Sequence, residues 1–279
     1  MSKMSSMIKM MNRQIIKRYG CIINRFRFST QLDSYVISYP KSGRTWLKAL
    51  IGKYLSLKHE LSEDLVLSPK DLTQNSGLPT LFFSHAGTGL GADEDPDSDL
   101  LYERHKKPYR NVILLGREIK DTLVSSYFHA TKRTRVFEGS ISEYIRTDRF
   151  GARRILEFYE LWLQTQDRAE RFMFLRYEDL HQDPKGSLIK VLEFIGETEI
   201  KEDIVNQSVD YCCFENLRRL EVQNRFQKSA LRVRDPEDIE SYKTRKGKVG
   251  GYTDYLSEED QAFVDELVKK RNWDFEKFA

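Results

Sequence analysis

Short runs of apolar residues alternate along the chain with longer segments in which apolar residues recur every three or four positions. The short runs, each of buried-strand length, lie at residues 35–39, 81–84, 112–115 and 172–175. Strands that alternate with helices are typical of a parallel sheet covered by helices. The pattern therefore predicts an α/β fold, a single three-layer domain with a central parallel sheet.

Several helices are predicted from apolar stripes together with residues typical of helix ends. One begins at Thr45, directly after a glycine-containing loop. Another is delimited by Asp183 as its N-cap, Pro184 at its first position and Gly196 after its last turn. The last helix begins at Ser257 as its N-cap. The segments predicted to be mobile loops are 56–80, 87–107 and 223–251.

The charge of the chain is unevenly distributed. Its 279 residues include 46 Lys and Arg against 43 Asp and Glu, a net charge of +3 that does not indicate a nucleic-acid partner. Residues 1–32 hold seven basic side chains and no acidic one, so the remainder, with 39 basic residues, has a net charge of −4. We expect residues 1–33 to form a basic extension and residues 34–279 the domain. The extension is interpreted either as a disordered tail or as a weak contact with an anionic membrane surface through residues 1–32.

Hydropathy and cysteine content bear on the compartment. No apolar run reaches the roughly 18 residues that a membrane-spanning helix needs, and the N-terminal segment lacks the apolar core of a signal peptide. The three cysteines, Cys21, Cys212 and Cys213, form no CxxC pair and leave one thiol over. These features predict a cytoplasmic protein with neither a disulfide framework nor a metal site.

The most informative segment joins the first strand to the helix at Thr45. It reads Tyr-Pro-Lys-Ser-Gly-Arg-Thr-Trp over residues 39–46, and such a turn directs free backbone N–H groups and a helix N-terminus at one anion. The nucleotide triphosphatase loop GxxxxGK[ST] differs at two positions, which here are Ser38 and Arg44. No clear magnesium-binding Asp follows the strand that ends at Leu115. The loop is therefore expected to bind an anion without a metal.

Two further segments carry residues suited to a phosphate. Arg117 follows the third strand, and Ser125 lies two helical turns later, so a guanidinium and a hydroxyl can surround one phosphate. The alternative for Arg117 is an ion pair with Asp121. Residues 245–252 read Arg-Lys-Gly-Lys-Val-Gly-Gly-Tyr, in which the glycines let the backbone approach an anion. Its alternative interpretation is a solvated basic loop.

Together these segments resemble the cytosolic-type sulfotransferase family, whose loop reads YPKSGTTW and whose later element reads RKGxxGxW. Arg44 and Tyr252 are the departures in these two motifs, and the resemblance extends over about residues 34–275. It implies a P-loop-like fold that binds 3′-phosphoadenosine 5′-phosphosulfate (PAPS) as donor, releases 3′-phosphoadenosine 5′-phosphate (PAP) and requires no metal. The nucleotide-binding residues that it implies are Lys41, Ser42, Gly43, Arg44, Thr45, Trp46, Arg117, Ser125, Tyr177, Cys212, Phe214, Arg245, Lys246 and Gly247.

The same resemblance implies the catalytic residues. Residues 81–85 resemble the strand whose His is the general base, which makes His85 the base, and Lys41 is the cation for the leaving phosphate oxygen; Ser125 completes the predicted catalytic set. Phe83 stands where many members have a second lysine beside the sulfuryl group. Either Lys41 acts alone, or Arg44 or Lys248 supplies the missing charge.

We therefore expect a sulfotransferase that moves a sulfuryl group from PAPS to the hydroxyl of an alcohol, a phenol or a lipid-like molecule. Two alternatives stay open: a P-loop nucleotide kinase-like enzyme and a catalytically silent nucleotide-binding module. The family's dimer motif KxxxTVxxxE is absent after Tyr252, which leaves the oligomeric state open. Aromatic residues that either line the acceptor pocket or belong to the core are Phe83, Tyr102, Tyr127, Phe128 and Phe137.

Overall fold

A computed structural model describes residues 34–74, 76, 78–85, 88, 109–164, 166–226 and 231–274. The expected extension, residues 1–33, and most of the expected loop at 87–107 lie outside the described residues, as does Cys21. No helix within the described ranges is long and apolar enough to cross a membrane.

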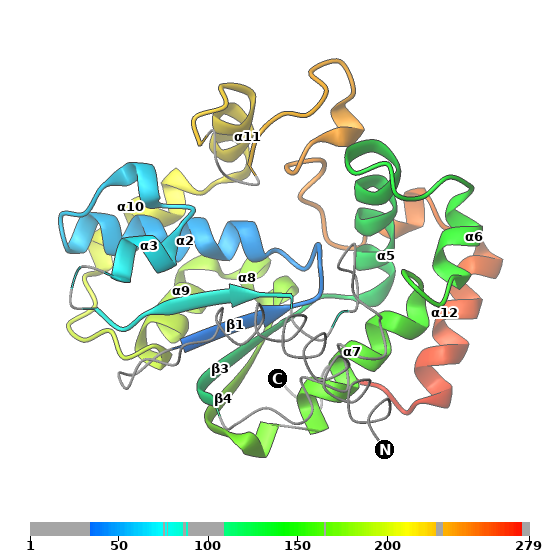
Figure 1. Ribbon diagram of the computed structural model, residues 1–279, viewed down its shortest axis with the longest axis horizontal. Helices are drawn as coiled ribbons and strands as arrows, with labels where there is room; N and C mark the ends of the chain where they lie inside the picture. The colour runs from blue at the N-terminus through cyan, green and yellow to red at the C-terminus, as the bar shows by residue number, and fades with distance from the viewer. Residues whose placement is uncertain are drawn as a thin grey trace, which may run out of the picture.

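The centre of the fold is a parallel sheet whose described strands have the order β2-β1-β3-β4 (Figure 1). The strands are β1 (Ser34–Ser38), β2 (Leu81–Ser84), β3 (Tyr109–Gly116) and β4 (Ala169–Arg176). The register pairs Ile37 of β1 with Ser84 of β2 and with Leu114 of β3. Because all these strands are parallel, their carboxyl ends share one edge of the sheet, where parallel sheets place ligands.

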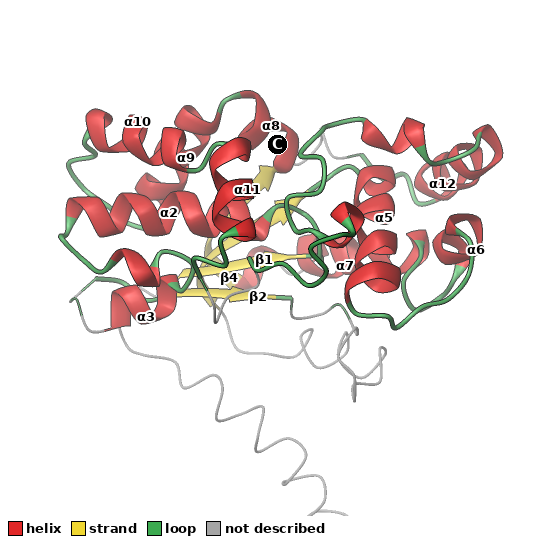
Figure 2. Ribbon diagram, turned by 90° about the horizontal axis from the view of Figure 1, so that it is seen from above, coloured by secondary structure: helices red, strands yellow, loops and turns green. Residues whose placement is uncertain are grey.

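Helices cover both faces of this sheet (Figure 2). On one side lie α2 (Arg44–Lys58), α3 (Pro69–Gln74), α8 (Tyr177–Gln182), α9 (Pro184–Phe194) and α10 (Glu202–Tyr211). On the other side lie α5 (Ile119–Phe128), α6 (Ile141–Arg146), α7 (Ala152–Gln164) and α12 (Glu258–Lys270). The remaining helical elements are α11 (Phe214–Val222), the 3₁₀ turns η1 (Glu63–Leu65), η3 (Gln166–Arg168), η4 (Ile239–Ser241) and η5 (Gly251–Asp254), and the π turn η2 (His129–Arg133).

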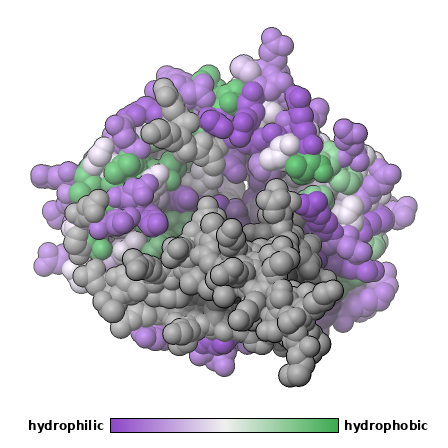
Figure 3. All heavy atoms as spheres, viewed as in Figure 1, coloured by the Kyte–Doolittle hydropathy of each residue, from purple (hydrophilic) through white to green (hydrophobic). Residues whose placement is uncertain are grey.

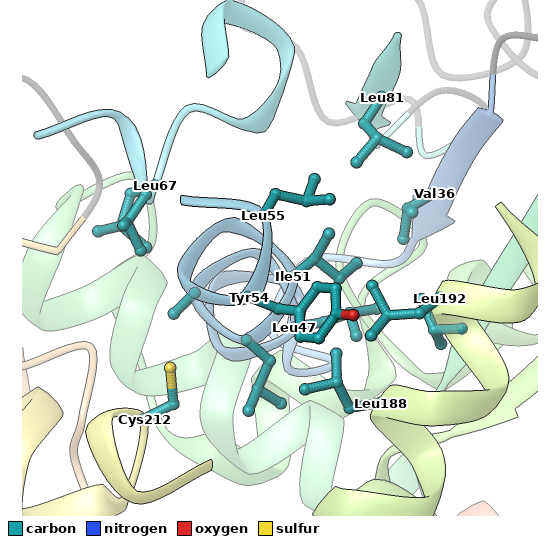
Figure 4. Close-up of a cluster of buried hydrophobic side chains, with 14 of the residues drawn as sticks. Val36, Leu47, Ile51, Tyr54, Leu55, Leu67, Leu81, Leu188, Leu192 and Cys212 are labelled. Carbon is teal, nitrogen blue, oxygen red and sulfur yellow. The ribbon is translucent and has the colours of Figure 1, made fainter. Parts of the chain in front are cut away.

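Alternation along β1 divides the core into two hydrophobic clusters. Val36 faces a cluster built mainly from α2, α9 and α10, with Ile51 of α2 and Leu192 of α9 at its centre (Figure 4). Tyr35 and Ile37 face the second cluster, built mainly from α5, α7 and α12. Successive side chains of a strand point to opposite faces, so a strand buried on both faces requires a helical layer on each. The predicted three-layer α/β fold with a parallel sheet is confirmed.

Helix ends follow the predicted signals, but the assignment of residues 56–80 as a mobile loop was wrong. The Asp183 carboxylate accepts a hydrogen bond from the backbone N–H of Gly186, and the Ser257 hydroxyl accepts one from that of Asp260. The segment at 56–80 is not a mobile loop: it contains the end of α2, the turn η1 and the helix α3. Its Val66 and Leu72 are buried against α2, so tertiary packing orders a stretch too short to show periodicity.

Candidate functional site

Each of the four strands within the described residues runs directly into a segment that the sequence analysis singled out. The loop at 39–46 follows β1, His85 follows β2, Arg117 follows β3, and Tyr177 begins α8 directly after β4. The shared strand edge thus brings together residues that are far apart in the chain (Figure 1).

The loop between β1 and α2 has an uncommon backbone. Lys41 has a φ of 77° and Gly43, the N-cap of α2, a φ of 94°, both in the left-handed region. A Cβ at position 43 would lie 2.5 Å from Cδ2 of Tyr177, so only glycine fits this contact. The first turn of α2 has no acidic residue, which leaves its positive N-terminal end uncompensated by its own side chains. This geometry suits an anion.

A cavity of about 530 Å³ lies at this edge of the sheet. Hydrophilic side chains surround the hollow between α11 and α5 on the face shown in Figure 3. Among its described lining residues are eight lysines and arginines but a single carboxylate, that of Asp121. The predicted residues that line it are Lys41, Gly43, Arg44, Thr45, Trp46, His85, Arg117, Ser125, Tyr177, Cys212, Phe214, Arg245, Lys246 and Gly247.

Ser42 is the predicted site residue whose side chain lies elsewhere. It is fully buried, and its hydroxyl oxygen is 3.4 Å from that of Tyr159 on α7. Its sequence position marked it as part of the anion loop, but the left-handed turns on either side point its side chain into the core. Ser42 therefore anchors the loop to α7.

Arg117 contacts three of the segments singled out in the sequence: the loop at 39–46, the segment at 245–252 and Tyr177. Its Nη1 donates to the backbone carbonyl of Lys41 at 3.1 Å, and its Nη2 donates to that of Lys248 at 3.2 Å. The guanidinium also lies over the ring of Tyr177, 4.3 Å from its centroid. The ion pair with Asp121, offered above as an alternative role, is present as well, at 3.8 Å. Its Nε is buried and has no hydrogen-bond partner among the described residues.

Two buried carboxylates hold the segment 243–252 over the cavity. Asp121 of α5 accepts hydrogen bonds from the backbone N–H groups of Gly250 (2.8 Å) and Tyr252 (3.0 Å). Glu221 of α11, which is 0% exposed, accepts from the backbone of Lys243 and Thr244. The segment is thus an ordered part of the site rather than the mobile, solvated loop that its composition suggested.

The side chains of this segment already have protein partners. Arg245 donates from Nη1 to Glu240 at 3.0 Å and to the hydroxyl of Tyr255 at 2.8 Å. Lys246 lies 3.1 Å from a carboxylate oxygen of Asp254. Both line the cavity, so a nucleotide phosphate would have to compete with these partners.

Gly247 and Phe214 approach each other closely at the rim of the same cavity. Gly247 has a φ of 61°, and a Cβ there would lie 2.5 Å from Cδ2 of Phe214. Phe214 is one of the exposed large apolar residues, 36% accessible, and it lines the cavity, so part of its ring is accessible to a ligand. Cys212, which lines the same cavity, is only 1% exposed, and burial raises the pKa of its thiol well above the usual value.

His85 is oriented by the first strand. Its Nδ1 lies 2.6 Å from the backbone carbonyl oxygen of Ser38, and because a carbonyl can only accept, Nδ1 carries the hydrogen. The Nε2 atom then has its lone pair available, as a general base requires. Burial, followed by the positive charge of Arg44, lowers the pKa of His85 well below 6.5, which keeps the ring neutral at neutral pH.

The cations around His85 include two that sequence reasoning missed. Lys48 and Lys243 line the cavity, and both act electrostatically on His85. Burial lowers the pKa of each to about 8, with Arg44 adding to the effect on Lys48 and Arg133 to that on Lys243. Burial and the charge of Lys243 also lower the pKa of Lys41 well below its usual value. The four-residue spacing from Arg44 to Lys48, one turn of α2, was the signal that could have revealed Lys48.

The described aromatic residues predicted to contact the acceptor or to belong to the core are partly buried and pack against other rings or against the core clusters. Tyr127 and Phe137 pack edge-to-face with Tyr144, at ring-centroid distances of 5.6 and 5.1 Å. Phe128 packs against Tyr255, 5.0 Å away. Phe83 packs against the cluster around α2. Tyr102 lies outside the described residues. None of these four residues is fully buried or lines the cavity described above, so whether they contact the acceptor or only support the core stays a prediction.

The family follows from comparison with known proteins. Residues 31–277 match the model of the sulfotransferase domain, so the chain belongs to the sulfotransferase family and is an enzyme of that class. Among its relatives, Cytosolic sulfotransferase 5 of Arabidopsis thaliana is 27% identical over 272 residues, which cover 86% of this chain and 79% of the relative. Flavonol 3-sulfotransferase of Flaveria bidentis is 27% identical over 273 residues, covering 86% and 81%. The kinase-like and silent-module alternatives are not favoured.

Solved structures support the fold. A mouse sulfotransferase, SULT7A1, complexed with PAP, superposes with a TM-score of 0.58 at 18% identity, covering 90% of this chain and 91% of that one. Retinol dehydratase in complex with androsterone and the inactive cofactor PAP gives a TM-score of 0.56 at 19% identity, covering 86% and 80%. No group of three or more His, Cys, Asp and Glu side chains that could hold a metal ion occurs within the described ranges.

Proposed function

We propose that this enzyme transfers the sulfuryl group of PAPS to the hydroxyl of a small-molecule acceptor, with His85 as the general base and Lys41 as the cation at the leaving oxygen. The observation that carries the proposal is the pair His85 and Ser38. Their hydrogen bond leaves a neutral imidazole with the lone pair of Nε2 available, in a cavity whose described lining includes eight lysines and arginines. Attack of a hydroxyl on an anionic donor requires a neutral base that takes up the hydroxyl proton. It also requires fixed positive charge that binds and stabilises the donor.

The cavity fits the donor in charge and shape. The left-handed turn at residues 41–43 and the N-terminus of α2 suit the 5′-phosphosulfate. The 3′-phosphate suits the place of Arg117 and Ser125, which both line the cavity. The Nε of Arg117 is buried and lacks a partner among the described atoms. Tyr177 and the half-open ring of Phe214 suit the adenine, and Gly43 and Gly247 have no Cβ that would disturb these rings.

The reaction is an in-line exchange of one S–O bond for another. The acceptor oxygen forms a bond to sulfur, and its proton moves to Nε2 of His85. The bond from sulfur to the bridging oxygen breaks, and that oxygen keeps the electron pair and leaves with the phosphate of PAP. Lys41 stabilises the charge that develops on this oxygen. Positioning and electrostatic stabilisation supply most of the catalysis in such a transfer.

The acceptor class is proposed from the relatives. The Flaveria enzymes are named for flavonols, which are phenols, and a phenol is the acceptor class we propose to test first. Relatives named cytosolic support a cytoplasmic location. Weak membrane contact through residues 1–32 and the boundary between residues 33 and 34 remain proposals that rest on the charge pattern alone.

The test compares nucleotides by calorimetry and then measures transfer. PAP is expected to bind in the presence of EDTA and more tightly than ATP with or without magnesium. With PAPS and the flavonol quercetin, the wild type is expected to form a sulfated product, and His85→Asn is expected to form it about 10²–10⁴-fold more slowly. Preference for ATP with magnesium, or undiminished transfer by His85→Asn, would contradict the proposal.

A further inference from the structure

Phe83 leaves the sulfuryl side of the cavity without the charge that a lysine at this strand position would provide. Its neighbours in the chain are otherwise in place, since His85 follows two residues later and reaches Ser38. Phe83 pairs with Val36 in the sheet register and packs on the face covered by α2. A replacement charge would therefore have to come from α2 or from the segment that covers the cavity.

Lys48 of α2 occupies the space beside Phe83. Its Nζ lies 5.0 Å from the centroid of the Phe83 ring, and the side chain lines the same cavity as His85 and Arg44. Helical side chains point toward the helix N-terminus, so Lys48 extends back along α2 toward the anion-binding loop. No carboxylate within the described ranges forms an ion pair with it, although the charge of Asp71 acts on it from farther away. Its ammonium group thus has a cation–π contact and an open side toward the cavity.

The other cations are less suited to this place. Lys248 is 57% exposed at its side chain, and its Nζ lies 3.9 Å from a carboxylate oxygen of Asp254. Lys243 is fixed through its backbone to Glu221, on the covering segment rather than on the sheet side. Arg44 is the first residue of α2, next to the anion-binding loop, and among the described side chains the cation–π contact with Phe83 is made by Lys48 instead. Lys48 alone among these four combines contact with Phe83 and a place in the cavity.

We propose that Lys48 is a catalytic residue that takes over, from α2, the contact with the sulfuryl oxygens that Phe83 cannot make from β2. The inference rests on the proposed function, because it requires PAPS in the cavity. It involves no proton transfer: Lys48 holds positive charge beside the sulfuryl group while the acceptor proton moves to His85. The cation–π contact with Phe83 positions the ammonium group, so the aromatic residue and the lysine act as a pair.

The experiment isolates the sulfuryl group by comparing PAPS with PAP, which differ only in that group. Calorimetry on the full chain should show that Lys48→Met lowers the affinity for PAPS about tenfold while the affinity for PAP stays within about twofold, as expected for loss of one charged contact. Lys48→Gln serves as a second variant should the first fold poorly, which the melting temperature reports. Adding Phe83→Lys to Lys48→Met should restore the ratio of the two affinities, since it returns a lysine to the strand.

Lys70→Met is the matched control. Lys70 is an exposed lysine whose Nζ lies 5.6 Å from the ring centroid of Phe82, the neighbouring residue of β2, but it does not line the cavity. Its removal should leave both affinities unchanged. An unchanged ratio in Lys48→Met, with both nucleotides still bound, would overturn the inference but not the proposed function. A wild-type protein that binds neither nucleotide would overturn both.

Discussion

The hydrogen bond from Nδ1 of His85 to the backbone carbonyl oxygen of Ser38, 2.6 Å long, joins the ends of two neighbouring strands and fixes the tautomer of the ring. Both residues lie at the carboxyl edge of the sheet: Ser38 is the last residue of β1, and His85 directly follows β2. The direction in which Nε2 points therefore depends mainly on backbone geometry, because the Ser38 hydroxyl is farther from Nδ1, at 3.5 Å.

Replacing His85 by Asn should abolish most turnover without affecting the nucleotide. A general base typically contributes 10²–10⁴-fold, so kcat with quercetin as acceptor should fall by about that factor. The affinity for PAP, measured by calorimetry, should remain within about threefold, because the base acts on the acceptor. A variant with a near-native kcat would remove His85 from the catalytic set.

The pH dependence of kcat/KM for PAPS should lack an acid limb near the usual histidine value. The neutral ring is the active form, and burial together with Arg44 lowers the pKa of His85 well below 6.5, so protonation and loss of rate should begin only below that pH. Replacing Arg44 by Met removes a positive neighbour, which raises the pKa of His85 and should move the acid limb to higher pH. A wild-type limb at or above pH 6.5 would contradict this account of the ring.

Arg117 should determine the preference for a 3′-phosphorylated nucleotide. We expect Arg117→Gln to weaken PAP binding by about tenfold or more, the loss typical of a charged hydrogen bond, while binding of adenosine 5′-phosphate changes much less. Arg171→Gln is the control, because Arg171 also donates to a backbone carbonyl, that of Phe194, and lies over its ring. Equal losses for both nucleotides in Arg117→Gln would indicate a purely structural role.

Asp121 should support nucleotide binding by holding the covering segment, in addition to its ion pair with Arg117. An Asn at this position can accept with one oxygen only, so Asp121→Asn loses a bond to Gly250 or to Tyr252 and should cost about 1–3 kcal/mol in the free energy of unfolding. Hydrogen exchange at these two amides should accelerate, and PAP should bind more weakly. Asp265→Asn, the control, removes the charge of a largely exposed partner of Lys120. It should change neither the exchange of these two amides nor the affinity for PAP. Unchanged exchange in Asp121→Asn would show that other contacts hold the segment.

The sequence predicted the parts of the site that are continuous in the chain. Residues 39–46 form one strand–loop–helix unit, and their spacing alone indicated an anion-binding turn. The cap at Asp183 and the burial of β1 on both faces follow from equally local rules.

What escaped prediction depends on contacts across the fold. Lys48 and Lys243 are separated by almost 200 residues, and neither stands in a motif, yet both lie within electrostatic reach of His85. In the sequence, nothing distinguishes Glu221 from the other charged residues of α11. Its role depends on the fold, in which it is buried and accepts hydrogen bonds from the backbone of residues 243–244. Likewise, the fully buried side chain of Ser42 could not be distinguished from a site residue by its position in the loop.

The left-handed backbone conformation of Lys41 lowers the stability of the folded chain, so the loop favours anion binding over stability at this residue. A non-glycine residue at a φ of 77° is less stable by about 1–2 kcal/mol than in a relaxed conformation, and burying its ammonium among other cations adds to the strain. A glycine here would relieve both at once and leave a more stable chain. The enzyme therefore trades thermal stability for chemistry at this residue, and a screen for heat resistance alone would select against the activity.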